Sequence, residues 1–242
     1  SAGSGGCAVA PPLAWKDAGY DRRDWPLLRY GRTYYTWEFE RYWYFYLLFG
    51  RLCYNPHTSG KIWLREFNRR FGAAGVDLAE LYSIAGKIIS LYVTAHAGAD
   101  QNLLWPEIDT GGLLDYYLQT PPGVPEFFSS ISQYVRNYLD GKTGSQVTPE
   151  DVAQYLDELG NHLLEKIALC RGNDPSPWHL TNREIAQGEI CEDDSTLRDF
   201  TVLANFARYH AAKIRSAVAL TLFYETGDFA QLLLARDLLQ ES

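Results

Sequence analysis

Apolar residues recur at three- and four-residue spacing in one segment after another of this chain, and that spacing is the period of an amphipathic helix. The clearest stripe consists of Leu78, Leu81, Tyr82, Ala85, Ile88, Ile89 and Tyr92. Further stripes at the same spacing occupy residues 127–138, 152–167 and 197–224, and no convincing strand ladder accompanies them. The pattern predicts a mainly α fold, with about seven helices in an irregular helical bundle or array.

Start and stop signals set the expected helix ends. Thr148 is an expected N-cap, because Pro149 follows at the first helical position and two acids stand in the first turn. Gly72 is expected to end a helix that begins at Thr58 or Ser59. The tripeptide Thr226-Gly227-Asp228 is expected to stop one long helix and to cap the last one.

Two long polar connections, 95–125 and 171–195, separate the predicted helices. Both are far longer than the median connection of about five residues. Residues 1–33 contain several Pro and Gly and no sustained period, so we expect an irregular lead-in or linker there. Residues 34–242 then form a single helical domain, with a subdivision near 141–148 as the alternative. The Gly- and Ser-rich start without Met suggests a piece of a longer protein.

Charge and missing motifs exclude several partners. The net charge is −8 and no basic stripe is present, so we expect no nucleic acid. No apolar run reaches the roughly 18 residues that span a bilayer, so we expect no membrane partner. The five scattered histidines form no HExxH, the four cysteines form no CxxC, and phosphate-binding glycine motifs are missing, so we expect no metal and no cofactor. Cys170 and Cys191 flank a loop, and the sequence leaves their pairing open.

Aromatic residues make up 14% of the chain and gather at 34–46, where Glu38, Glu40 and Arg41 are interspersed among the rings. Rings stack on the apolar face of a sugar, and carboxylates bind its hydroxyls or transfer protons. This run is therefore a candidate carbohydrate site. The alternative is an aromatic helix, ending at Gly50, that the protein encloses on most sides while its acids face solvent.

A second candidate is the polar segment 94–109, which follows a predicted helix. It collects His96, Asn102, Trp105 and Glu107 within a short stretch. Loops on a rigid scaffold often carry binding groups. The alternative is a packed connector that uses Asn and Asp for its turns.

Several segments together resemble a known group of proteins; they are Trp37–Pro56, Ile62-Trp63, Phe67, Arg70-Phe71-Gly72, Trp105-Pro106-Glu107, Phe128–Ile131, Thr148–Ala153 and Tyr209–Ile214. They resemble the C-terminal helical region of a large bacterial glycoside-hydrolase-like family, in the style of α-glucuronidases and α-N-acetylglucosaminidases. The resemblance covers about residues 30–242. Members of that family carry a catalytic (β/α)-barrel upstream of this region, and no barrel precedes the helices in this sequence. No catalytic residue is therefore carried over.

The resemblance implies a helical accessory domain of a carbohydrate-active enzyme, secreted or periplasmic, whose partners are carbohydrate and the (β/α)-barrel of the parent protein. The expected sugar contacts are Trp37, Glu38, Arg41, His96, Asn102, Trp105 and Glu107. Two other functions stay open. One is a self-contained glycoside hydrolase with Glu38 or Glu107 as its acid, and the other is a helical protein–protein interaction module.

Overall fold

The computed structural model of the chain describes residues 34–35, 38–96, 114–171 and 192–240. Within these ranges the chain is mainly helical, with seven helices of nine or more residues and no strand. The predicted fold class is therefore confirmed. Within the same ranges, one isolated parallel β-bridge pairs Phe128 with Val147.

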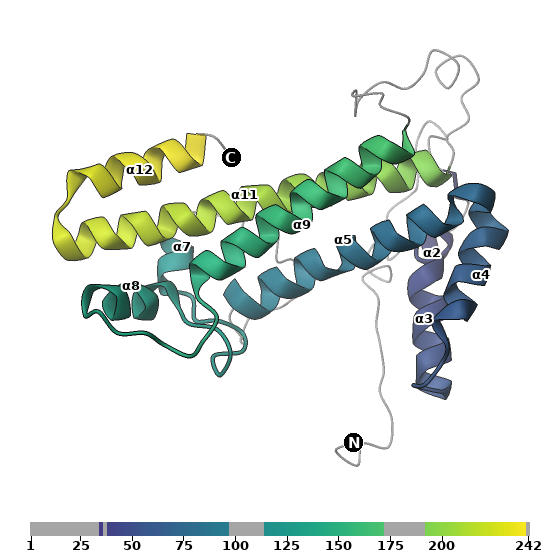
Figure 1. Cartoon of the computed structure of the whole chain (residues 1–242), viewed down its shortest axis with the longest axis horizontal. Coiled ribbons are helices and arrows are strands. Elements are labelled where there is room, and N and C mark those ends of the chain that lie inside the picture. Colours follow the sequence, from purple (N-terminus) through teal and green to yellow (C-terminus); the bar gives the residue numbers. More distant parts are fainter. Residues whose placement is uncertain (1–33, 36–37, 97–113, 172–191, 241–242) are drawn as a thin grey trace, which may run out of the picture.

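Three long helices form the centre of the molecule: α5 (Gly75–His96), α9 (Pro149–Cys170) and α11 (Glu192–Thr226). Figure 1 shows α9 lying side by side with α11, the longest helix, and α5 packed against both. Their facing apolar residues make one continuous core. The predicted stripes at 78–92, 152–167 and 197–224 supply most of that core.

The contact between α9 and α11 is close because small residues line it. Gly160 of α9 lies against Ala204 and Ala207 of α11, and both alanines are fully buried. A Cβ added to Gly160 would stand 2.8 Å from the carbonyl oxygen of Ala204. The two helix backbones therefore approach one another more closely here than a larger residue would allow.

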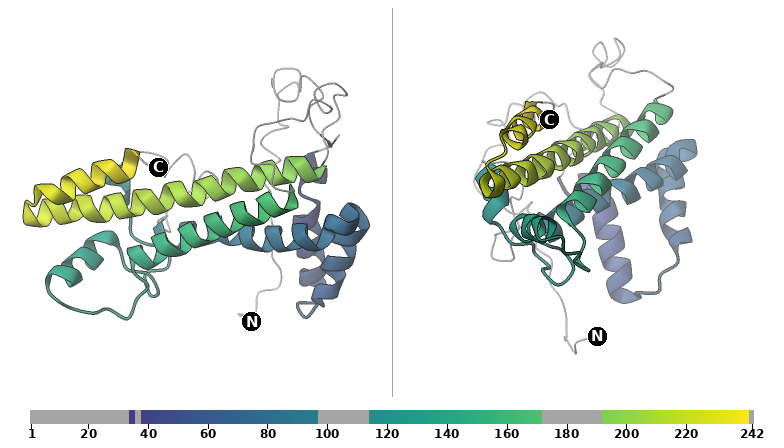
Figure 2. Two further views of the ribbon diagram at one scale, coloured as in Figure 1. Left: turned by 45° about the horizontal axis from the view of Figure 1, so that its top comes forward. Right: turned by 60° about the vertical axis from the view of Figure 1, so that its left-hand side comes forward.

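One end of the long helices carries α2 (Glu38–Arg41), α3 (Trp43–Tyr54) and α4 (Gly60–Phe71), with the short 3₁₀ turn Gly72–Ala74 leading into α5. In Figures 1 and 2, α3 and α4 lie together across the ends of the long helices. The N-terminus of α11 reaches the same region. Segments far apart in the sequence therefore meet at this end.

The opposite end carries α7 (Leu114–Gln119), α8 (Ile131–Leu139) and α12 (Phe229–Gln240). The last helix, α12, folds back along the second half of α11 (Figure 2). The buried Ser216 hydroxyl of α11 donates to the carbonyl oxygen of Ala235 at 2.7 Å, which fixes this return.

The predicted caps are found. Thr148 accepts from the backbone N–H of Asp151, whose carboxylate accepts from the Thr148 N–H, and this reciprocal pair begins α9. Ser59 caps α4, and Gly72 ends that helix at a φ of 58°, where a residue with a Cβ would be strained. Asp228 accepts from the Ala230 N–H at the start of α12.

Several predicted boundaries were wrong, and α7 lies inside the segment 95–125 that was predicted to be a connection. The helix expected to stop at Gly50 continues to Tyr54, because a glycine inside a helix weakens it without ending it. The stripe from Phe127 becomes helical only at Ile131. The acidic run that begins at Glu192, expected in a loop, forms the first turn of α11, where carboxylates face the positive end of the helix dipole.

The expected enclosure of α3 was also wrong. No residue of α3 is buried, and Phe45, Tyr46 and Leu52 are each about 40% exposed. The rings of Phe45 and Phe49 stack on one another at a centroid distance of 6.0 Å. The inner side of α3 contacts the protein, and its outer side is an apolar surface.

Residues 60–96, which span α4 and α5, are long and apolar enough to cross a membrane by length and composition, the one such stretch within the described ranges. A core helix passes the same test, and α5 places Leu81, Ile88 and Tyr92 fully inside the core. One such helix is weak support for a span. The expectation of no membrane partner stays a prediction.

Candidate functional site

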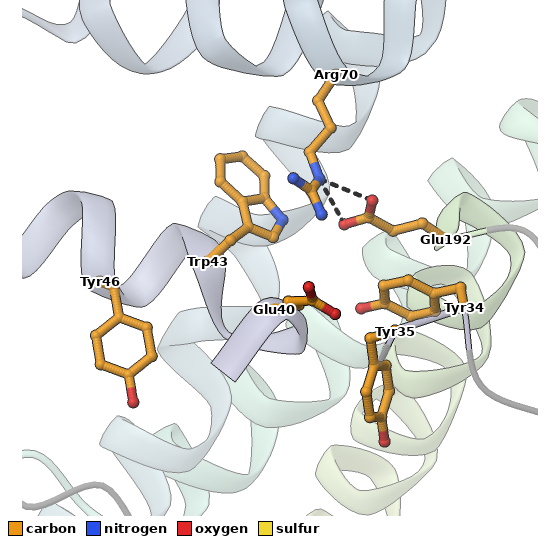
Figure 3. A pocket seen from close by; sticks show the side chains of 7 residues that line it. All are labelled: Tyr34, Tyr35, Glu40, Trp43, Tyr46, Arg70 and Glu192. Carbon is orange, nitrogen blue, oxygen red and sulfur yellow. Dashed lines mark hydrogen bonds and ion pairs between the residues drawn. The ribbon is translucent and has the colours of Figure 1, made fainter. Parts of the chain in front are cut away.

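A pocket of about 770 Å³ opens at the end of the molecule where α2, α3, α4 and α11 meet. Its lining consists of Tyr34, Tyr35, Glu40, Trp43, Tyr46, Arg70 and Glu192. Six of these residues lie between Tyr34 and Arg70, and Glu192 comes from the first turn of α11, far along the chain (Figure 3). Four of the seven are aromatic, and the other three carry charge.

The charged part of the pocket is built around Arg70. The Nε of Arg70 lies 2.7 Å from each carboxylate oxygen of Glu192, so the last turn of α4 is tied to the first residue of α11. The guanidinium carbon of Arg70 also lies 4.9 Å from the ring centroid of Trp43, within range of a cation–π contact. In Figure 3 the Glu40 carboxylate lies between Trp43 and the two tyrosines, Tyr34 and Tyr35.

A layer of rings behind the pocket holds Trp43 in place. Trp43 contacts Phe67 edge-on at a centroid distance of 5.1 Å, and Tyr44 contacts Phe67 at 4.8 Å. Tyr44 also contacts Tyr82 of α5 at 5.1 Å, and Tyr82 in turn contacts Phe200 of α11. The wall of the pocket therefore rests on the core, and its indole is held at a fixed position.

Burial and nearby carboxylates disfavour ionisation of the tyrosines around the pocket. Burial and then the charge of Glu192 raise the pKa of the Tyr34 phenol above its ordinary value. Burial raises the pKa of Tyr82 to about 12, and the carboxylates of Glu192 and Asp199 add to that rise. Both tyrosines therefore stay protonated, as neutral hydroxyls, over the physiological pH range.

The indole N–H of Trp43 has no hydrogen-bond acceptor among the described residues, although the atom is buried. In Figure 3 this nitrogen faces the side of the pocket where Arg70 and Glu192 lie. A buried donor without an acceptor is costly, and such atoms often mark a place where water or a ligand binds. Because the nitrogen is buried, an oxygen atom of a ligand reaches it only if a side chain that covers it moves aside.

This arrangement is suited to binding a ring-shaped polar molecule. The faces of Trp43 and Tyr46 can stack on C–H groups, while Glu40 and Glu192 accept hydrogen bonds from hydroxyls. Within the described ranges, no group of three or more His, Cys, Asp or Glu side chains is arranged to hold a metal ion.

The predicted site residues divide into four sets, the last of which is His96 alone. Arg41 lies beside the pocket, and its Nη2 is 2.7 Å from the Asp199 carboxylate. Burial lowers the pKa of Arg41, but the charge of Asp199, the hydrogen bond to it and the neighbouring tyrosines together raise the pKa above its ordinary value. The Glu38 backbone is part of α2, but its side chain lies outside the described parts of the structure. The residues outside them altogether are Trp37, Asn102, Trp105 and Glu107.

His96 was wrongly placed in a loop, because it is the last residue of α5 and only 5% exposed. Its Nε2 has no hydrogen-bond partner among the described residues. Burial lowers the pKa of His96 to about 4. Its ring is therefore neutral at pH 7 and packs in the core, 5.9 Å from the ring of Tyr117.

A buried polar cluster surrounds His96 and connects α5, α7 and α11. The Tyr117 hydroxyl hydrogen-bonds to Nδ1 of His210 and donates to the Tyr92 hydroxyl at 3.3 Å. The Nζ of Lys213 lies 5.2 Å from the ring centroid of Tyr117. Burial, followed by the charges of Lys213 and His96, lowers the pKa of His210 to about 3. This cluster fixes α7, because the buried Tyr117 joins α7 to the core.

Sequence analysis missed Arg70 and Glu192, which complete the pocket. The two residues are 122 positions apart, so no local pattern brings them together. The available signal was the acidic run at Glu192, which begins a long helix and could have been recognised as its first turn. The cluster of rings with Glu40 was the part visible in the sequence.

No protein-family model, curated protein or solved structure matches this chain.

Proposed function

We propose that the chain is a helical accessory domain of a carbohydrate-active enzyme and that it binds sugar in the pocket between α2, α3, α4 and α11. The observation that carries the proposal is the combination of four aromatic rings and two carboxylates around one cavity of about 770 Å³. A cavity of this size holds a ligand of a few hundred daltons, such as a short oligosaccharide.

Sugar recognition requires flat apolar surfaces and hydrogen-bonding groups at once, and the pocket has both. Trp43 is held rigidly by Phe67 and Phe71, so little conformational entropy is lost when a sugar stacks on it. Glu40 and Glu192 supply acceptors around that ring, and the Arg70 guanidinium supplies donors. The resemblance to the helical region of glycoside-hydrolase-like proteins supports the same ligand class.

The outer side of α3 supports docking to the barrel of a parent enzyme. Phe45 and Leu52 are each 40% exposed, and the apolar surface they form continues to Tyr46, which lines the pocket. Contiguous apolar surface of this kind is typical of interaction sites. A partner seated on α3 would therefore border the pocket, and a sugar bound there would lie at the rim of the partner's own site.

Titration of the chain with neutral, acidic and amino oligosaccharides tests the binding, with calorimetry and tryptophan fluorescence as the readouts. We expect a fluorescence change that Trp43→Phe removes and that Trp63→Phe, on α4 and outside the lining, retains. Binding without dependence on Trp43 would place the sugar elsewhere and refute this pocket.

Tyr46→Ala gives a second measure of the same site. Loss of one stacking ring costs about 1 kcal/mol, which is about a fivefold loss of affinity. The matched control is Tyr54→Ala, on the same helix and 93% exposed, which should leave the affinity unchanged. Equal effects of the two variants would contradict the proposal.

A helical interaction module is the second candidate, and the unburied apolar side of α3 favours it. In that function α3 binds a protein partner and the pocket has no sugar ligand. It would gain support if no oligosaccharide binds while the chain self-associates in analytical ultracentrifugation and Phe45→Asp abolishes that association.

A further inference from the structure

Helices α3 and α4 form a hairpin that projects away from the long helices, and residues 51–65 make up its far end (Figures 1 and 2). We call these residues the hairpin tip. Tyr54, the last residue of α3, is 93% exposed, and Leu52 and Leu64 are each about 40% exposed. The tip therefore presents apolar side chains to whatever lies beyond the end of the hairpin.

The hairpin tip is basic, although the chain as a whole is acidic. Residues 42–65 contain no Asp or Glu and carry +3, whereas the chain carries −8, so the remaining residues together carry −11. Arg51 lies in the last turn of α3 and Lys61 in the first turn of α4, so the two cations flank the turn between the helices. Both are exposed, and neither has an acidic partner in the described parts of the chain. The third cation, Arg65, lies 3.3 Å from a carboxylate oxygen of Glu66.

The turn at the tip satisfies its own backbone groups. The backbone N–H of Asn55 donates to the carbonyl oxygen of Arg51 at 2.8 Å, and the Asn55 carbonyl accepts from the hydroxyl of Thr58 at 2.6 Å. The side-chain oxygen of Asn55 accepts from the backbone N–H of His57 at 3.0 Å, and Ser59 caps α4. The tip can therefore enter a less polar environment at little cost in unpaired backbone groups.

The length of the hairpin separates the tip from the acidic part of the molecule. Helix α3 has 12 residues and is about 18 Å long. The Debye length at physiological ionic strength is about 8 Å, so the acids at the base of the hairpin, such as Glu40 and Glu192, are largely screened from the tip. A flat anionic surface can therefore attract the tip while the rest of the chain stays at a distance.

We propose that the hairpin tip binds the surface of a membrane that contains anionic lipids. The side chains of Tyr54, Leu52 and Leu64 insert at the level of the headgroups, where aromatic residues are enriched in membrane proteins. Arg51 and Lys61 bind the negatively charged headgroups. Nucleic acid would use the charges but leave the apolar side chains in water, so lipid is the partner that accounts for both. The missing spanning run led us to expect no membrane partner, but surface contact needs no such run.

Flotation of the whole chain with lipid vesicles tests the proposal. Vesicles of phosphatidylcholine alone are compared with vesicles that contain about 30% phosphatidylserine. Each cation near an anionic surface strengthens binding about fivefold, so the two at the turn predict a partition coefficient about 25-fold higher on the phosphatidylserine vesicles. Because salt screens this attraction, an ionic strength of about 1 M should remove most of the difference.

Two double variants test whether the attraction comes from the tip. Arg51→Gln with Lys61→Gln should lower binding to the level measured on phosphatidylcholine. The matched control is Lys87→Gln with Arg136→Gln, because these exposed cations lie on α5 and α8 and their removal changes the net charge equally. The control should retain the preference for phosphatidylserine. Circular dichroism confirms that both variants are folded.

Tyr54→Ala tests the apolar part of the contact. It should weaken binding to the phosphatidylserine vesicles about fivefold, whereas Tyr224→Ala, at a position 63% exposed near the end of α11, should not. The same Tyr54→Ala variant is expected to leave sugar affinity unchanged, so membrane binding and sugar binding are tested separately. The surface around Phe45, about 13 Å nearer the pocket along α3, stays available to a protein partner.

Four results would overturn the proposal without touching sugar binding. The first is equal binding to the two kinds of vesicle, or binding to neither. The second is an equal loss in the tip variants and in their controls, because the attraction would then not depend on the tip. The third is binding that Tyr54→Ala leaves unchanged, because the tip would then not insert. The fourth is self-association that the tip variants abolish while no vesicle binds, which would identify a second copy of the chain as the occupant.

Discussion

Gly160 of α9 provides a sharp test of how closely the central helices pack. Replacing glycine by alanine inside a helix normally stabilises it by about 0.5–1 kcal/mol, because glycine loses more backbone entropy. At Gly160 the new Cβ would lie 2.8 Å from the Ala204 carbonyl oxygen and 3.0 Å from Cγ of Arg208. Ordinary contacts begin at 3.4 Å, so α9 and α11 must move apart by about half an ångström.

Overpacking of this kind costs about 1–3 kcal/mol, which exceeds the gain in helix propensity. We therefore expect Gly160→Ala to lower the free energy of unfolding by about 1 kcal/mol, and Gly160→Val to lower it further. The matched control is Gly86→Ala on α5, because nothing lies within 4 Å of a Cβ added there. That variant should be more stable than the parent by about 0.5–1 kcal/mol.

Urea unfolding followed by circular dichroism at 222 nm measures both changes. For a chain of this size, 1 kcal/mol corresponds to a shift of about 2–4 °C in Tm, so thermal unfolding gives a second reading. The opposite signs of the two glycine variants are the decisive result. If Gly160→Ala stabilises the chain as Gly86→Ala does, α9 and α11 are not in the close contact described, and the reasoning fails.

Three further predictions concern the core and the caps. His96 and His210 are neutral in the fold because burial lowers their pKa values to about 4 and 3, so each should cost about 2 kcal/mol of stability as the pH falls from above 6.5 to 5. Urea unfolding across that pH range tests this, and replacing either histidine by Gln, which does not titrate, should make the free energy of unfolding depend less on pH. Thr148→Ala should cost about 1 kcal/mol by removing the cap of α9, and Thr148→Ser should restore it; unchanged unfolding in the Ala variant would contradict the role of the cap. Leu163→Ala should cost about 2–5 kcal/mol, whereas Leu169→Ala, at a position 69% exposed, should cost little; similar losses in thermal unfolding would refute the assigned core.

The helical fold was predictable because its signals are local. Thr148 and Asp151 stand three residues apart and form their capping pair within one turn, so the sequence shows the pair directly. Gly50 was misread because an internal glycine and a terminal one look alike in a sequence. A glycine ends a helix only when the residues after it pack better outside the helix than within it, and that depends on the tertiary fold.

The pocket was predictable only in part. The aromatic run with Glu40 pointed to α2 and α3, since rings and acids stood together in the sequence. Arg70 and Glu192 belong to helices that meet only through packing, so neither residue was a candidate beforehand. His96 was a candidate that the structure removes from the site. Its polar neighbours in the sequence suggested a binding loop, but it lies at the end of α5 and its side chain is buried in the core.

The ion pair between Arg70 and Glu192 joins α4 to a helix that begins 122 residues later. The pocket is therefore complete only when the first and last thirds of the described chain are docked together. A ligand that binds there binds only the fully assembled protein. At a free concentration one hundred times its dissociation constant, it would raise the free energy of unfolding by about 2.7 kcal/mol. For a chain of this size that is a rise in Tm of about 5–11 °C, so thermal-shift screening of a glycan library can identify the natural ligand without any prior choice of sugar.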